Sequence, residues 1–218
     1  MSRAEIVELL DELGFSRGCI VETIVTTRRP DGSPSAAPMG ITRTGPDILE
    51  IKPFKSSATY RNLLTSPEAC VNVTNDPELF LVTAFKREIR EEFARPLIQD
   101  DLSLEAAEAT VFVEVLSCRD ISEDRGCFVA RAHSIEVHRP LPRVFSRGRA
   151  EAIEAIVHST RVETYLRMGR RLDVEKLNKR FSECKEVVER VSSPDSAELK
   201  VIRTLETLIG RWREEASR

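Results

Sequence analysis

Short strand-like segments follow one another through the first 140 residues, and residues typical of tight turns separate them. The segment at 19–27 is rich in β-branched residues, and the turn-forming sequence Arg28-Arg29-Pro30-Asp31-Gly32-Ser33 follows it. The expected strands are residues 19–27, 36–42, 48–52, 69–73, 111–115 and 127–137. Six short strands in antiparallel order, with short helices between them, predict a small β-barrel.

Helical patterns precede and interrupt these strands. Ser2 and Glu5 have the spacing of a capping box, which predicts a short amphipathic helix at the start of the chain. Asp76 and Pro77 have the character of a cap and a first-turn proline for a later helix. Residues 95–104 have no such pattern, and we expect a loop there.

The character of the chain changes after Pro140-Leu141-Pro142. From there on, apolar residues recur every three or four positions, which predicts amphipathic helices that pack together. The expected organisation is therefore a barrel domain at residues 1–145 and a C-terminal helical region at residues 146–218. We expect the helical region to pack on the barrel or to extend a dimer.

Charge and composition narrow the range of partners. The net charge of -3 and the pI near 5.8 give no electrostatic reason to expect binding to nucleic acid or to an anionic membrane. No charge-free run approaches the ~20 residues that a membrane span needs. The first residues contain no apolar leader, so we expect a cytoplasmic protein.

Basic residues gather in the helical region, and two interpretations of them stay open. They are a solvated helical surface, or they are a contact surface for nucleic acid or for a protein partner, and we prefer the first. The residues concerned are Arg161, Arg167, Arg170, Arg171, Lys176, Lys179 and Arg180.

The sequence gives little reason to expect a metal site or a catalytic nucleophile. The five cysteines are scattered without a C-x-x-C pair or metal-ligand spacing, and we expect reduced thiols. His133 and His138 are an odd number of positions apart, so a strand places them on opposite faces unless a bulge intervenes, and no metal site is expected. The sequence contains no G-x-G-x-x-G and no G-x-x-x-x-G-K-[ST], which argues against Rossmann and P-loop enzymes. No catalytic residue is assigned.

One stretch, Lys55-Ser56-Ser57-Ala58-Thr59-Tyr60-Arg61-Asn62, concentrates hydroxyls, two cations and an amide at an expected helix start. The unpaired N–H groups and the positive dipole end of a helix N-terminus favour an anion there, and Ser and Thr hydroxyls add donors. The cluster therefore predicts a phosphate site. An ordinary Ser-capped helix with Lys55 and Arg61 exposed explains the same residues without a ligand.

A second segment favours the phosphate interpretation. Ala37-Pro38-Met39-Gly40-Ile41-Thr42 ends a strand with small residues and a glycine, which would let a flat ring approach the backbone. An edge strand with a bulge at Pro38 and Gly40 is the alternative. Glu22, which alternates with two isoleucines, is either a polar group at the barrel mouth or a paired core carboxylate.

Four segments, taken in order, resemble a known family. They are Val21-Glu22-Thr23-Ile24-Val25-Thr26-Thr27, Ala37-Pro38-Met39-Gly40-Ile41, Ser57-Ala58-Thr59-Tyr60-Arg61-Asn62-Leu63 and Val71-Asn72-Val73-Thr74-Asn75-Asp76. Together they resemble the mostly archaeal domain-of-unknown-function 447 (DUF447) family of the flavin reductase-like, FMN-binding split-barrel superfamily. The likeness covers roughly the first two thirds of the chain, and the helical tail is similar to that family's as well.

The resemblance implies a mainly β fold with α, a split antiparallel β-barrel followed by a helical region. It also implies a homodimeric flavoprotein with FMN at or near the subunit interface. The residues that would hold the FMN phosphate are Ser57, Thr59 and Asn62, with Lys55 as a helper. Those that would line the isoalloxazine ring are Met39, Gly40, Ile41 and Thr42. Position 58 is Ala where relatives more often have a basic residue, and Lys55 and Arg61 would compensate for this departure.

FMN itself carries the hydride chemistry, so a protein of this kind needs few catalytic side chains. The leading interpretation is a flavin-dependent reductase or oxidoreductase that takes electrons from a reduced nicotinamide or a deazaflavin, or passes them to a small acceptor stacked on the flavin. The alternative is a protein that binds FMN, or another phosphorylated planar ligand, without catalysis.

Overall fold

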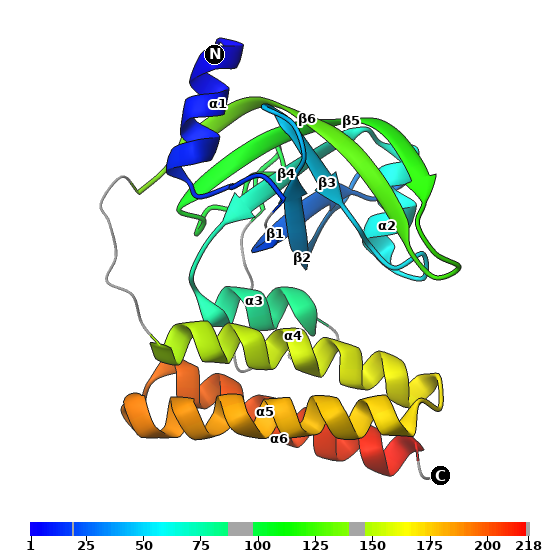
Figure 1. Cartoon of the computed structure of the whole chain (residues 1–218), viewed down its shortest axis with the longest axis vertical. Helices are drawn as coiled ribbons and strands as arrows, with labels where there is room; N and C mark the ends of the chain where they lie inside the picture. The colour runs from blue at the N-terminus through cyan, green and yellow to red at the C-terminus, as the bar shows by residue number, and fades with distance from the viewer. Residues whose placement is uncertain (19, 87–97, 140–146, 217–218) are drawn as a thin grey trace. The chain divides into compact units, whose positions relative to one another are not determined.

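The computed structural model describes residues 1–18, 20–86, 98–139 and 147–216, and Figure 1 labels their helices and strands. The strands are β1 (Ile20–Arg28), β2 (Pro34–Arg43), β3 (Ile48–Ile51), β4 (Glu68–Val73), β5 (Ala109–Asp120) and β6 (Gly126–Val137). The helices are α1 (Arg3–Glu12), α2 (Ala58–Thr65), α3 (Pro77–Ala84), α4 (Arg147–Arg167), α5 (Arg171–Val191) and α6 (Ala197–Ala216). Residue 19 and residues 95–97, which we assigned to a strand and a loop, lie outside the described residues.

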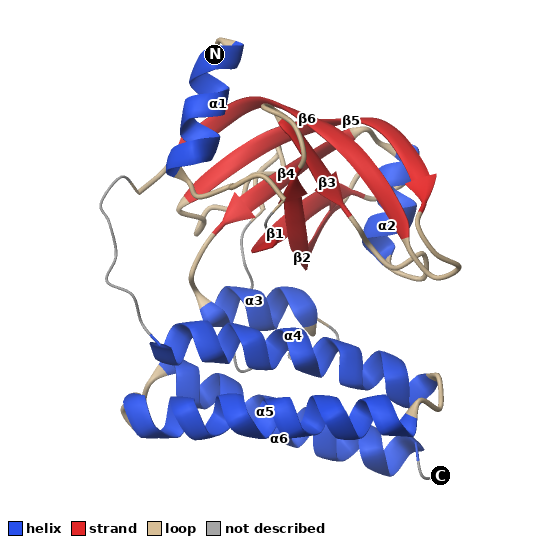
Figure 2. Cartoon of the chain, in the orientation of Figure 1, coloured by secondary structure: helices blue, strands red, loops and turns tan. Residues whose placement is uncertain are grey.

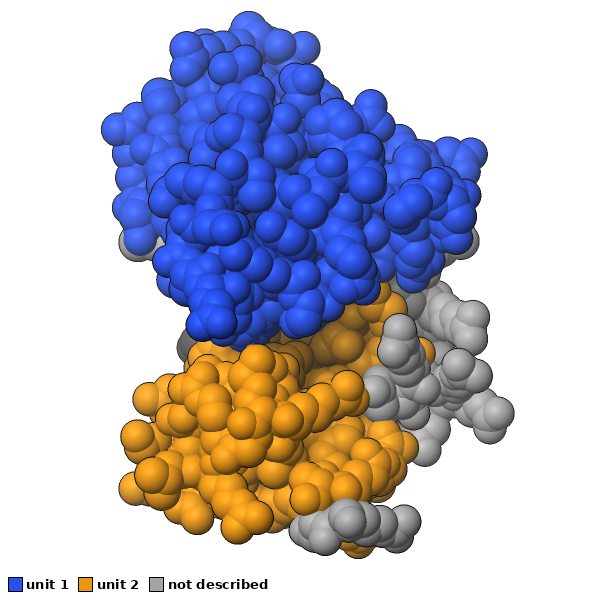
Figure 3. Space-filling model, turned by 90° about the vertical axis from the view of Figure 1, so that its right-hand side faces the viewer, with its two compact units in different colours: residues 1–74, 96–141 blue, residues 75–95, 142–218 orange. Residues whose placement is uncertain are grey.

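The chain divides into two compact units, which Figure 3 colours separately. Unit 1 contains residues 1–74 and 96–141, and unit 2 contains residues 75–95 and 142–218. The expected boundary between residues 145 and 146 lies outside the described residues. The observed division is also not a single cut at one point in the chain. Helix α3 precedes β5 and β6 in the sequence, but it packs against α4 and α6 and so belongs to unit 2.

Unit 1 is a closed barrel in which the strands follow the order β1-β2-β3-β6-β5-β4. Every neighbouring pair is antiparallel. Figure 2 shows these six strands in red. The predicted fold class, mainly β with α and a split antiparallel barrel followed by helices, is confirmed.

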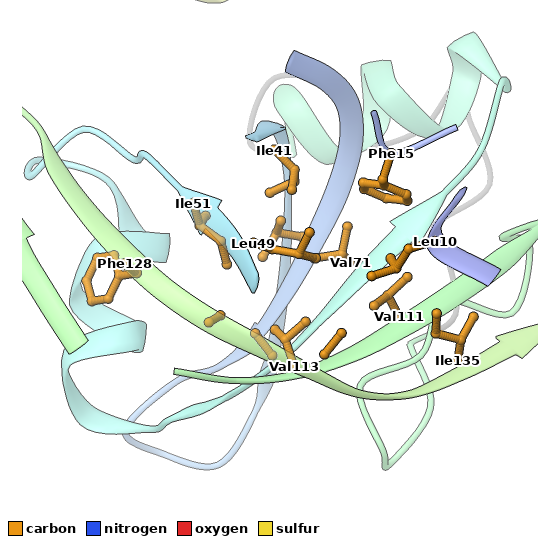
Figure 4. Packing of buried hydrophobic residues seen from close by; sticks show 14 of the residues in the cluster. Leu10, Phe15, Ile41, Leu49, Ile51, Val71, Val111, Val113, Phe128 and Ile135 are labelled. Carbon is orange, nitrogen blue, oxygen red and sulfur yellow. The ribbon is translucent and has the colours of Figure 1, made fainter. Parts of the chain in front are cut away.

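One hydrophobic cluster fills the barrel, because alternate residues of each strand point inward. Its fully buried members include Ile41, Leu49, Ile51 and Val71 (Figure 4). Helix α1 adds Ile6 and Leu10 to this cluster, and α2 adds Leu63. The two helices lie at opposite ends of the barrel (Figure 1), so the same core fixes both.

Two ion pairs hold α1 against the barrel. The buried Arg43 donates from Nη1 to Asp11 Oδ1 at 2.6 Å. Asp47, also buried, accepts from Arg3 Nε at 3.0 Å and from Arg3 Nη2 at 2.7 Å. Each pair joins α1 to the region where β2 leads into β3, so the helix is fixed by charge as well as by apolar packing.

Unit 2 is helical, as the apolar periodicity predicts. On α5 the buried residues are Val174, Leu177, Phe181, Cys184 and Val188, which recur every three or four positions. Helices α4 and α5 form an antiparallel pair joined by a short turn, and α6 packs on both. Among the described helices, none is both long enough and apolar enough to cross a membrane.

Candidate functional site

The predicted anion-binding turn lies between β3 and α2. Ser57 is the N-cap of α2, and its Oγ accepts a hydrogen bond from the backbone N of Tyr60 at 3.1 Å. A hydroxyl that accepts one hydrogen bond still has a proton to donate. The first turn of α2 contains no acidic residue, so its positive dipole end is not neutralised within the helix. This end of α2 can therefore accept an anion.

Thr59 and Asn62 lie three positions apart on α2, and both are buried. Asn62 is 3% exposed, and its Nδ2 donates a hydrogen bond to Thr27 Oγ1 on β1 at 2.9 Å. This bond ties α2 to the barrel and occupies one of the two amide hydrogens. The role of Thr59 and Asn62 in holding a phosphate stays a prediction.

Lys55 lies on the same turn and is paired with a carboxylate. Its Nζ is 2.8 Å from Oδ2 of Asp120, the last residue of β5, and its backbone N donates to Asp124 O at 2.8 Å. The hydrogen bond to Asp120 is the main cause that raises the pKa of Lys55. The ammonium group is therefore charged at neutral pH.

Arg61 bends back toward the start of α2. Its Nη1 donates to the backbone O of Ser56 at 2.8 Å, while the rest of the side chain is exposed. The guanidinium thus lies beside the turn that contains Ala58. This location agrees with a compensating role, which stays a prediction.

The four residues predicted to line a ring alternate between the two faces of β2. Ile41 belongs to the buried core, and Met39 packs against the same cluster, so both side chains point into the barrel. Gly40 and Thr42 therefore face outward. A ligand on the outer surface can meet the backbone of Gly40, whereas Thr42 faces outward but is only 8% exposed. The side chain of Ile41 is fully buried, and that of Met39 is partly buried.

Gly40 lies opposite Glu22 on β1. A Cβ added at Gly40 would lie 2.9 Å from Ile20 Cγ2 and 3.4 Å from Glu22 Oε1. Because Gly40 has no side chain, a planar group on the outer surface can approach the backbone of β2 closely at this position. Glu22 is exposed on the same outer face, so its interpretation as a core carboxylate is wrong.

Strand β3 brings the two predicted segments together. Ile41 on β2 pairs with Ile51, the last residue of β3, and the chain then passes directly into the turn that contains Ser57. The barrel therefore places the middle of β2 beside the strand that leads to the phosphate turn.

Lys52 is a candidate that the sequence reasoning missed. Thr42 pairs with Glu50, so Glu50 and Lys52 share the outer face with Thr42 and Gly40. Lys52 Nζ lies 2.8 Å from Glu50 Oε2, and this bond is the first cause that lowers the pKa of Glu50. The alternation of positions 50 and 52 was visible in the sequence, but their position next to Gly40 depends on the pairing of β2 with β3.

The hairpin between β5 and β6 supports the turn from the other side. The guanidinium of Arg125 lies 3.9 Å from the ring centroid of Phe54. A Cβ added at Gly126 would lie 2.5 Å from Tyr60 Cε2, so the glycine makes room for the tyrosine ring. That ring packs edge to face on Phe128, with centroids 5.4 Å apart. The start of α2 and the turn before it thus pack against the β5–β6 hairpin.

The described cysteines are free and protonated. Burial raises the pKa of Cys70 and of Cys184 to about 12. Burial is also the main cause that raises the pKa of Cys118 and Cys127. At neutral pH these four groups are thiols, so none of them is an activated nucleophile.

His133 and His138 were expected on opposite faces unless a bulge intervenes, and β6 contains such a bulge. The pairing of β5 with β6 shifts at His133, which is the extra residue of a bulge and reverses the alternation. His133 nevertheless packs on the ring of Phe112 with centroids 6.4 Å apart, and His138 Nε2 lies 3.2 Å from Thr110 Oγ1. Within the described residues no group of three or more His, Cys, Asp or Glu could hold a metal ion.

Comparisons with known proteins agree with this fold. The model of the DUF447 N-terminal domain, a protein of unknown function, matches residues 21–138. An FMN-bound DUF447 protein from Methanosarcina mazei is 26% identical with a TM-score of 0.69, covering 91% of this chain and 98% of that one. The styrene monooxygenase flavin reductase from Pseudomonas putida S12 is 14% identical with a TM-score of 0.46, covering 55% of this chain and 79% of that one. The Methanosarcina likeness extends well beyond the barrel.

Proposed function

Since this chain belongs to the DUF447 family, we propose that it is an FMN-binding flavoprotein and acts as a flavin-dependent reductase or oxidoreductase. The observation that supports FMN most directly is the FMN-bound relative from Methanosarcina mazei, which is similar along 91% of this chain. The barrel also presents residues that suit the two ends of the cofactor, its phosphate and its planar ring.

The phosphate end fits the turn before α2. The Ser57 hydroxyl and the N-terminal amides of α2 are hydrogen-bond donors, and Lys55 adds a positive charge beside them. These groups are donors and cations rather than acceptors, which is the chemistry that a phosphate requires. Thr59 and Asn62 would complete the cradle from the buried face of α2.

The ring end fits the outer face of β2. Gly40 has no side chain to hold a planar group away from the strand, and a Cβ there would collide with Ile20. Thr42 and Lys52 lie on the same face and would meet the polar edge of the ring. Ile41 would contribute through its backbone, because its side chain is fully buried in the core, whereas Met39 is only partly buried.

Bound FMN supplies hydride transfer at its N5 atom. The residues of this chain would bind the cofactor, orient it and shape access to it. Because the thiols of the four described cysteines are protonated at neutral pH, we assign no covalent role to them. The electron donor of the proposed reductase is a reduced nicotinamide or a deazaflavin.

An absorbance spectrum of the purified protein, with mass analysis of the ligand that heat releases, tests FMN binding. We expect the visible bands of oxidised flavin and a released ligand with the mass of FMN. Ser57→Ala should weaken FMN binding by about tenfold, whereas Ser56→Ala, at an exposed neighbour, should change it by less than about twofold. A colourless protein that gains no flavin spectrum when FMN is added would exclude the proposal.

Turnover requires a separate measurement on the FMN-loaded protein. Anaerobic addition of NADH, NADPH or a reduced deazaflavin should bleach the flavin spectrum for at least one donor, and an added acceptor should restore it. If FMN binds but no donor of these classes reduces it, the protein is an FMN-binding protein without catalysis.

We also propose that the working form is a homodimer. Ile20, which is 69% exposed, lies on the outer face beside Gly40, where a second copy would cover both the side chain and a bound ring. Light scattering on the eluting protein should give twice the chain mass of 24.6 kDa. Ile20→Glu should shift the protein toward the monomer, since it places a charge in the buried contact.

A further inference from the structure

We infer that Asp120 competes with the phosphate of the ligand for Lys55, and that it thereby sets how strongly the site prefers a phosphorylated flavin. The inference rests on the proposed function, because it concerns the phosphate turn of the same site. Asp120 is the last residue of β5, and the barrel carries it to a turn that is distant in the sequence.

The two partners of the Lys55–Asp120 pair differ in how firmly the rest of the structure holds them. The backbone of Lys55 is held by its hydrogen bond to Asp124 O, and its side chain is 28% exposed. The side chain of Asp120 is 67% exposed. The Asp120 side chain can therefore rotate into solvent, while the backbone of Lys55 stays anchored two residues before Ser57.

The arriving phosphate would be the stronger partner for the ammonium group. A phosphate monoester carries a charge between -1.5 and -2 at neutral pH and three acceptor oxygens, whereas the Asp120 carboxylate carries a single charge. A carboxylate that remained on Lys55 would also repel the phosphate, since like charges a few ångströms apart raise the energy of the bound state. When FMN binds, its phosphate therefore replaces Asp120 as the ion-pair partner of Lys55.

The size of the effect follows from the exposure of the pair. Ion pairs this open to solvent contribute little, so removal of the Asp120 charge should tighten FMN binding by about two- to fivefold. Riboflavin has the same ring but no phosphate. Its affinity should therefore change by less than about 1.5-fold, because no group of riboflavin competes for Lys55.

The experiment compares FMN and riboflavin dissociation constants, measured by flavin fluorescence on flavin-free protein at low salt. The variants are Asp120→Asn, Lys55→Met and the double variant, with Glu123→Gln as the matched control. Glu123 is exposed in the same hairpin, so its substitution removes one negative charge without removing the Lys55 partner. We expect Asp120→Asn alone to tighten FMN binding, and we expect no such gain in the Lys55→Met background.

Four results would overturn the inference, and three of them concern Asp120→Asn. They are unchanged or weaker FMN binding by Asp120→Asn, an equal gain for riboflavin, and a gain that persists without Lys55. An effect of Glu123→Gln as large as that of Asp120→Asn would also overturn it, since the cause would then be net charge. A wild-type protein that binds neither flavin would remove the proposed function itself, which is a distinct outcome. Circular dichroism of each variant confirms that it is folded.

Discussion

The side-chain oxygen of Asn72 accepts a hydrogen bond from the backbone N of Leu104 at 2.9 Å. The same oxygen accepts from Thr110 Oγ1 at 3.1 Å, and the amide nitrogen donates to Ile24 O at 3.0 Å and to Thr26 Oγ1 at 3.1 Å. One buried amide thus joins β1, β4 and β5 to the segment that precedes β5. Asn72 belongs to a segment that carries the family resemblance, and its described bonds are structural.

Replacing Asn72 with Ala should be strongly destabilising. Each buried polar group that loses its partner costs about 1–3 kcal/mol, and this change removes the partner of several at once. We expect the free energy of unfolding to fall by about 3 kcal/mol or more, measured by urea denaturation. Ser117→Ala, at an exposed position of β5, should change it by less than about 0.5 kcal/mol. Similar losses for the two variants would contradict the prediction.

The hydrogen bond from Asn62 to Thr27 should be measurable as a coupling energy. Asn62→Ala and Thr27→Ala should each lower the free energy of unfolding, because both side chains are buried and bonded to each other. In a double-mutant cycle we expect a coupling of about 1 kcal/mol. Additive effects of the two substitutions would show that the bond contributes nothing to stability.

Gly126→Ala should destabilise the protein through overpacking. The new Cβ would lie 2.5 Å from Tyr60 Cε2, and the tyrosine ring cannot move away freely because it packs on Phe128. A cost of about 1–3 kcal/mol is expected in chemical denaturation, and Tyr60→Leu should remove much of it. Gly210→Ala is the control, since that helical glycine has open space around it and the change should stabilise α6 by about 0.5–1 kcal/mol. Equal effects at both glycines would contradict the steric explanation.

Acid should weaken the contact between α1 and the barrel. The hydrogen bond from Arg3 is the first cause that lowers the pKa of Asp47 below 3.8. Because the folded-state pKa is the lower one, the stabilisation is fully present above the unfolded-state pKa and is lost as the pH falls through the folded-state value.

Urea denaturation between pH 6 and pH 3 measures this loss. We expect the free energy of unfolding to fall less steeply below about pH 4 in Arg3→Met than in the wild-type protein. Arg17→Met removes the same charge from an exposed residue outside the Asp47 pair and should keep the wild-type slope. If the free energy of unfolding falls with pH in parallel for the Arg3 variant and the wild-type protein, the Arg3–Asp47 pair does not cause the loss of stability in acid.

Patterns that are local in the chain were reliable guides to this structure. Ser57 caps α2 and Asp76 caps α3, as their positions before apolar helical runs predict. A cap acts on the two or three residues after it, so the sequence contains both partners side by side. Alternation and turn residues locate the six strands for the same reason, although β5 extends to Asp120, five residues beyond its expected end.

Contacts between distant segments could not be derived in this way. The bulge at His133 depends on how β5 pairs with β6, and the position of Lys52 beside Gly40 depends on how β2 pairs with β3. The outward direction of Gly40 and Thr42, and the inward direction of Met39 and Ile41, likewise follow from which face of β2 the barrel closes around. The binding role of these segments stays a prediction, and the sequence did not show which of their side chains face the core and which face outward.

The sequence by itself therefore determined the elements, their order, their caps and the family. Only the tertiary structure decided which charges meet, as when β5 ends with Asp120 against Lys55. The physical reason is the separation along the chain between the residues that interact. Helix capping and strand alternation are set by neighbours within a few positions, whereas ion pairs and register depend on closure of the whole barrel, which no short stretch of sequence encodes.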